Sequence, residues 1–298
     1  MNLNPSIRNT VKESEIMSNT KKSRKTSCCD NNAETAEELL QKGITAYKAK
    51  DFETAAKYFK KAAELGNADA QFFLGVCYDK GIGVGQDSAE AAKWFRKAAD
   101  QGDAEAQHED GTWYSAGTFV NKDYSESVKW FRKAAEQGHA KAQFKVGLCY
   151  AEGTGVLKDK AEAVRWWRRA ADQGYVEAQF ELYSCYANGD GVAKSDRDAV
   201  KWLRKAAEQG NAEAQCMLGC WYGTGKIVEQ DDRESEKWIR RAAEGGHSQA
   251  QFMLGLSYLE GDMNTKNPVE AVKWLRKAAE QGNEDAKRIL RKLGMEIE

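Results

Sequence analysis

The stretch KWFRKAAEQG at residues 129–138 decides the fold, because variants of it return along the chain at a constant interval. The final glycine of each copy falls every 36 residues, at Gly66, Gly102, Gly138, Gly174, Gly210, Gly246 and Gly282. A fixed period of this length indicates a repeat protein, in which each repeat packs on its neighbours and together they bury a continuous core.

Each period predicts two helices. In the stretch 139–153, HAKAQFKVGLCYAEG, the residues Ala142, Val146 and Tyr150 share one face at about 100° per residue, and Gly153 is typical of a helix end. The second helix of each period follows a residue able to cap it: Asp87, Asp123, Asp159, Ser195, Asp231 and Asn267. It then carries one tryptophan and an Ala-Ala pair, which predict its buried face. We therefore expect an all-α solenoid of antiparallel helix pairs.

The consensus A-x-A-Q-F-x-L-G-x-x-Y-x-x-G-x-G-V, followed by D-x-x-E-A-V-K-W-F-R-K-A-A-E-Q-G, resembles the Sel1-like repeat, a relative of the tetratricopeptide repeat. The resemblance covers residues 67–282 as six repeats. Residues 33–66 resemble a tetratricopeptide hairpin, and residues 283–298 predict a helix that caps the open end. The resemblance implies a right-handed α/α superhelix whose concave face binds a protein or peptide.

Composition narrows the classes of partner. The chain has 45 basic and 46 acidic residues, so we expect no nucleic-acid binding. Basic pairs such as Arg132-Lys133 are flanked by acids and predict a solvated face rather than a phosphate-binding stripe. No apolar run is long enough for a transmembrane helix, and the start lacks the apolar stretch of a secretory signal. We expect a cytoplasmic monomer.

Residues that break the pattern are the candidates for partner contact. Trp113 and Trp221 replace a cysteine or serine of other repeats, which predicts either the edge of a groove or local packing. His108 replaces phenylalanine and Asp110 replaces leucine or valine. With Glu109 they predict either a polar notch for a ligand or a worn repeat that its neighbours tolerate. The other candidates, on the variable face of the first helices, are Lys145, Glu181, Met217 and Met253.

Some disulfide-rich members of the resembled family carry two cysteines per repeat, which cross-link the two helices. These pairs are missing here, so the cysteines predict reduced thiols. Cys216 and Cys220 lie four apart on one helix face and suggest core filling or a metal pair. No tetrahedral ligand set is visible, so we expect no metal and no cofactor. Residues 1–32 predict a disordered basic tail, in which Cys28 and Cys29 are an acylation site or part of a plain flexible tail.

No nucleophile–base–acid set and no phosphate loop is visible, so we do not expect an enzyme. The sequence and its resemblance favour a scaffold or adaptor that binds a peptide or protein segment. The alternative is a binder or hydrolase of small cell-wall or β-lactam-type ligands, a property suggested for some relatives.

Overall fold

The computed structural model describes residues 34–118, 120–261 and 266–295, and the chain falls into two compact units that end and begin at Lys122 and Asp123. The helices of the first unit are α2 (Ala36–Lys48), α3 (Phe52–Glu64), α4 (Ala68–Lys80), α5 (Ser88–Asp100) and α6 (Ala104–Ala116). Those of the second are α7 (Tyr124–Glu136), α8 (Ala140–Glu152), α9 (Lys160–Asp172), α10 (Val176–Asn188), α11 (Asp196–Glu208), α12 (Ala212–Thr224), α13 (Asp232–Glu244), α14 (Ser248–Glu260), α15 (Pro268–Glu280) and α16 (Glu284–Lys292).

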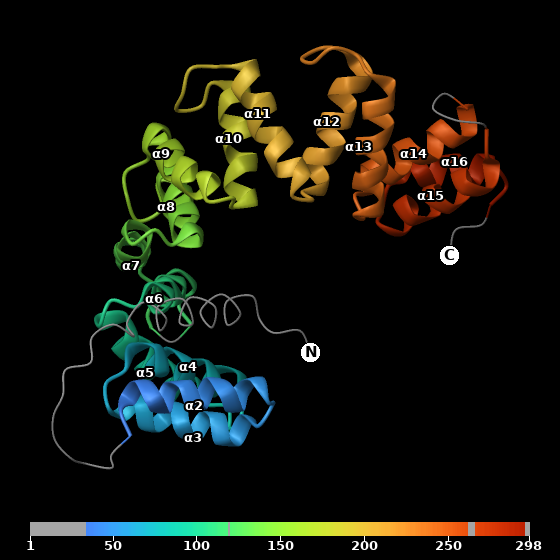
Figure 1. Cartoon of the computed structure of the whole chain (residues 1–298). Helices are drawn as coiled ribbons and strands as arrows, with labels where there is room; N and C mark the ends of the chain where they lie inside the picture. Colours follow the sequence, from blue (N-terminus) through green and yellow to red (C-terminus); the bar gives the residue numbers. More distant parts are fainter. Residues whose placement is uncertain (1–33, 119, 262–265, 296–298) are drawn as a thin grey trace. The chain divides into compact units, whose positions relative to one another are not determined.

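Within each unit every helix packs against the next one along the chain, as Figure 1 shows for α2 to α5 and for α12 to α15. All regular secondary structure in the described ranges is helical. The predicted all-α solenoid is therefore confirmed. The tail at 1–32, with Cys28 and Cys29, lies outside the described residues. None of the helices in the described ranges is long and apolar enough to cross a membrane.

The helices begin and end where the sequence predicts. Before α9, the N–H of Glu162 donates to Oδ1 of Asp159 at 2.9 Å. After α8, Gly153 adopts φ = 79°, a backbone conformation that favours glycine. The carboxylate of Glu162 then pairs with Arg165 at 2.7 Å. His139, at the start of α8, caps that helix by accepting the N–H of Ala142 on Nδ1 at 3.1 Å.

A glycine in the first helix lets the second helix approach closely. A Cβ added to Gly147 would lie 2.3 Å from Nε1 of Trp167, so only glycine fits this contact. The indole of Trp167 donates to the carbonyl of Phe144 at 3.2 Å, which ties α9 to α8. Leucines and alanines fill the remaining space in the second unit, among them Leu182, Leu203, Leu218, Ala163, Ala170 and Ala206.

A ladder of buried glutamines joins successive repeats. Nε2 of Gln179 donates to the carbonyl of Ala171 at 3.2 Å, and its Oε1 accepts from Nε2 of Gln209 at 2.8 Å. Gln143 makes the same pair of bonds, to Ala135 at 3.0 Å and from Gln173 at 2.8 Å. Each such glutamine therefore links three helices, which explains the Gln of the A-x-A-Q pattern.

The tryptophans of the second helices belong to the core, as the Ala-Ala pairs predict. Of the six repeated tryptophans, Trp94 is half-buried and the other five are buried: Trp130, Trp166, Trp202, Trp238 and Trp274. The basic pairs beside them are largely exposed, as expected of a solvated face, and some of them also contact aromatic side chains. Nζ of Lys133 lies 3.6 Å from the centroid of Trp130, and Nη2 of Arg204 donates to the hydroxyl of Tyr222 at 2.6 Å.

Candidate binding surface

The first helices of the second unit, α8, α10, α12 and α14, form a row that carries four of the predicted partner contacts. Lys145, Glu181, Met217 and Met253 occupy the same place in successive repeats. All four side chains are half-buried, so each rests on the helices and still reaches solvent. We call these four residues and Trp221 the first-helix face.

Side chains of non-consecutive helices lie near one another along this row. The carboxylates of Glu152 on α8 and Glu181 on α10 are close enough to repel each other. The ring of Tyr183 on α10 lies edge-on to Trp221 of α12, with centroids 5.7 Å apart. Sγ of Cys220 on α12 lies 3.9 Å from Sδ of Met253 on α14. Partner contacts spread along the row would therefore rest on one connected surface.

Glu181 is the one acidic residue of the first-helix face. Burial raises the pKa of its carboxyl group, and the neighbouring charge of Glu152 raises it further. An ionised carboxylate in this place lacks part of its hydration and faces a like charge. A cation brought by a partner would relieve both costs.

Trp221 is half-buried and packs on Tyr183, whose position is glycine in other repeats, for instance Gly147 and Gly219. The larger side chain of Tyr183 therefore gives the indole an aromatic contact that a glycine could not provide. The sequence prediction missed Tyr183, although its departure from the glycine pattern was a readable signal.

Three predicted contact residues lie inside the first unit instead. Trp113 is 8% exposed and packs edge-on against Phe95, with ring centroids 5.2 Å apart. His108 and Asp110 are 1% and 0% exposed. These three side chains cannot reach a partner while α6 stays packed, so the predicted notch is closed and only Glu109 remains half-buried.

Asp110 is accommodated by an ion pair. Its Oδ2 lies 2.6 Å from Nε of Arg96, and that guanidinium also donates to the hydroxyl of Tyr114 at 3.3 Å. The interpretation of a merely worn repeat is therefore incomplete, because this aspartate has a specific cation.

A group of possible metal ligands lies on the same helix. Glu105, His108 and Glu109 each offer one donor atom, and these atoms lie within 4.8 Å of one another. Nδ1 of His108 is 3.4 Å from Oε1 of Glu109. A nitrogen and two carboxylates at this spacing suit a divalent transition metal, although the buried histidine restricts access.

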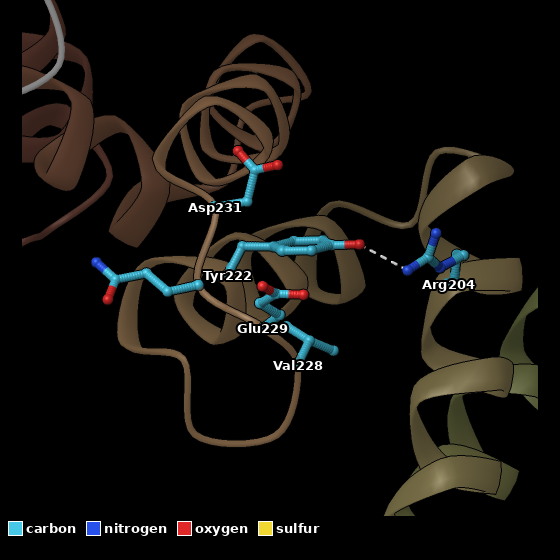
Figure 2. Close-up of a pocket in the computed structure, with 6 residues that line it drawn as sticks. Arg204, Tyr222, Val228, Glu229 and Asp231 are labelled. Carbon is cyan, nitrogen blue, oxygen red and sulfur yellow. Dashed lines mark hydrogen bonds between the residues drawn. The ribbon is translucent and has the colours of Figure 1, made fainter.

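A hollow of about 580 Å³ lies beside the loop between α12 and α13. Its walls are Arg204, Tyr222, Val228, Glu229, Gln230 and Asp231. Figure 2 shows the Tyr222 hydroxyl pointing to Arg204, with Val228 and Glu229 on the loop nearby.

A glycine of the repeat is replaced in the loop beside this hollow. In another repeat, Gly155 adopts φ = 73°, and a Cβ there would lie 2.3 Å from the carbonyl oxygen of Tyr124. The equivalent residue in the α12–α13 loop is Ile227. An isoleucine does not fit so close to the preceding helix, and Ile227 is not among the described residues that adopt a positive φ.

Comparison with known proteins agrees with this architecture. The profile of the Sel1 repeat matches residues 32–67, 68–103, 104–139, 140–175, 176–211, 212–247 and 248–283. The first of these segments includes the hairpin for which the sequence indicates a tetratricopeptide-like form.

Two solved structures are similar over most of the chain. A protective antigen of uropathogenic Escherichia coli with an SLR fold is 36% identical, with a TM-score of 0.81, and the match covers 98% of this chain and 59% of that one. A Sel1 repeat protein from Oxalobacter formigenes is 34% identical, with a TM-score of 0.76, over 87% of this chain and 76% of that one.

A shorter segment of the chain is similar to beta-lactamase HcpA of Helicobacter pylori, with 44% identity over 52 residues. It spans 17% of this chain and 21% of HcpA. The seven profile matches cover most of the sequence and agree with the helix pairs and the two similar structures. The chain belongs to the Sel1 repeat family.

Proposed function

We propose that this chain is a scaffold whose first-helix face binds a segment of a partner protein. Sel1 repeat proteins generally mediate protein–protein interactions. The observation that carries the proposal is the half-buried carboxylate of Glu181, whose pKa is raised by burial and by Glu152, beside exposed parts of Met217 and Trp221. This combination destabilises the isolated chain, and a partner that brings a cation and an apolar side chain would remove that cost.

The chemistry of the face specifies the partner segment. A lysine or arginine opposite Glu181 would neutralise the two neighbouring carboxylates. Methionine side chains are flexible and polarisable, and tryptophan supplies a large apolar area, so Met217 and Trp221 suit an apolar side chain next to that cation. The expected ligand is an extended or helical segment that pairs a basic residue with an aliphatic or aromatic one.

Selection from a random peptide library against the purified full chain tests this proposal. We expect enrichment of peptides with Lys or Arg next to an apolar residue. Glu181→Gln should weaken a selected peptide about tenfold, because it removes the charge partner of the ligand cation. Glu208→Gln is the matched control, since Glu208 is exposed on a second helix, α11, and loses the same charge.

Site-specific crosslinking locates the ligand. A photoreactive phenylalanine at position 217 should capture the peptide, whereas the same residue at position 165, on the strongly exposed side of α9, should not. Enrichment of acidic peptides, or equal binding by the Glu181→Gln and Glu208→Gln variants, would contradict the proposal.

Binding or hydrolysis of a β-lactam is the second candidate function, favoured by the similarity to HcpA. The hollow beside Arg204 is the place we assign to such a ligand, because the guanidinium suits a carboxylate and Glu229 could act as a base. A chromogenic β-lactam should then be turned over by the purified chain and not by its Arg204→Ala or Glu229→Gln variants. Absence of turnover in the parent chain would exclude the hydrolase.

A further inference from the structure

Three sulfur-containing side chains of the second unit belong to one cluster. Cys216 and Cys220 lie four residues apart on α12, and Met253 lies on α14. Cys216 and Cys220 lie close enough on one face of α12 to interact electrostatically, and Sγ of Cys220 is 3.9 Å from Sδ of Met253. Both cysteines are free thiols. We propose that Cys216, Cys220 and Met253 form a binding site for one Cu(I) ion.

The spacing of the sulfurs supports three-coordinate binding. In a planar site with metal–sulfur bonds of about 2.3 Å, neighbouring ligand atoms lie roughly 4.0 Å apart. The separation between Cys220 and Met253 matches this value without movement of the helices. Two thiolates and a thioether form a soft donor set, which selects Cu(I) over harder divalent cations.

The electrostatics of the site suit a cation. The negative charge of Glu213, one turn earlier on α12, acts on Cys216. Binding would form three copper–sulfur bonds and release the two thiol protons to water.

Access and local packing are also compatible with an ion site. Cys216 is buried, but Cys220 and Met253 are half-buried, so an ion can enter from the first-helix side. The place of Cys216 in the repeat holds phenylalanine elsewhere, as in Phe144 and Phe180. The smaller cysteine therefore leaves more room beside Cys220 than these repeats have.

Titration of the reduced, full-length chain with Cu(I) under anaerobic conditions tests the proposal, with a chromogenic Cu(I) chelator as competitor. Cys28 and Cys29 are replaced by serine in every sample, so that these thiols do not compete. We expect one copper ion per chain. Cys216→Ser/Cys220→Ser should weaken copper binding by more than about 100-fold. Removing a residue that only hydrogen-bonds to a metal ligand already costs up to about 100-fold in affinity, and removing the ligand itself costs more.

Two further variants separate the site from general thiol chemistry and from misfolding. Cys149→Ser/Cys185→Ser removes the same number of helix thiols elsewhere in the second unit and should bind copper like the parent. Met253→Leu keeps the apolar volume and should weaken copper about tenfold or more by removing the thioether. Circular dichroism confirms that each variant remains helical.

Several outcomes would overturn the proposal. They are equal copper affinity in the parent and in Cys216→Ser/Cys220→Ser, no effect of Met253→Leu, or an X-ray absorption spectrum in which nitrogen or oxygen replaces the three sulfur neighbours. Because peptide binding is proposed to depend on Glu181, loss of copper binding and loss of peptide binding are distinguishable.

Discussion

Oδ2 of Asp110, a side chain with no exposed surface, lies 2.6 Å from Nε of Arg96. Other repeats place an aliphatic residue where Asp110 stands, for example Leu74 and Val146. An arginine recurs at the Arg96 position and binds a tyrosine there too, as Arg204 binds Tyr222. The buried carboxylate therefore uses a cation that the repeat already provides for another purpose.

Arg96→Met should destabilise the chain by about 3 kcal/mol, because it leaves the buried Asp110 without its closest cation. This is the lower end of the cost of breaking a buried pair, since Arg96 itself is 35% exposed. Arg204→Met is the control, because its repeat has Leu218 in place of the acid, and it should cost about 1 kcal/mol. Urea denaturation measures both losses, and equal losses would show that the ion pair contributes little.

Asp110→Leu should maintain or raise the thermal stability. It restores the aliphatic residue of the other repeats, and Arg96 keeps Tyr114 and solvent as partners. Replacing a buried charge by a well-packed apolar residue is often neutral or stabilising by about 1–4 kcal/mol. Thermal unfolding followed by circular dichroism gives the sign. A fall in midpoint as large as that of Arg96→Met would mean that the carboxylate stabilises more than this ion pair.

Gln179→Leu should cost about 1–3 kcal/mol, because Gln179 is buried and the change removes bonds to both Ala171 and Gln209. Gln249→Leu, at an exposed position, should stay within about 0.5 kcal/mol of the parent. Chemical denaturation compares the two variants. If their effects were equal, the glutamine ladder would not hold successive repeats together.

Glu181→Gln should raise the melting temperature near neutral pH. The pKa of Glu181 is raised in the folded chain, so the native state binds this proton more tightly than the unfolded state. The ionised group thus destabilises the fold above its folded pKa, and this cost disappears as pH falls and the group is protonated. The gain from the substitution should vanish in acid. Melting curves across this range test the sign, and a lower melting temperature at neutral pH would contradict it.

That result would also separate binding from folding. The same substitution is expected to weaken a basic peptide ligand while it stabilises the free chain. A variant that merely damaged the fold would lose both properties.

The sequence by itself determined the period, the helix pairs and their boundaries. These depend on local rules: a capping side chain at Asp159, a glycine with positive φ at Gly153, and an apolar face that repeats with the helix. Each rule acts within a few residues, so it is readable in the linear order. The glycine at 147 was also readable as part of the buried stripe.

Only the tertiary structure decided what the irregular residues do. Arg96 and Asp110 are 14 positions apart, Tyr183 and Trp221 belong to different repeats, and Cys220 reaches Met253 on another helix. Whether a polar or aromatic side chain is buried, paired or exposed depends on neighbours that packing supplies from distant positions. The sequence therefore identified the exceptions, and the packing of the helices assigned His108, Asp110 and Trp113 to the interior while Glu181, Met217 and Trp221 still reach solvent.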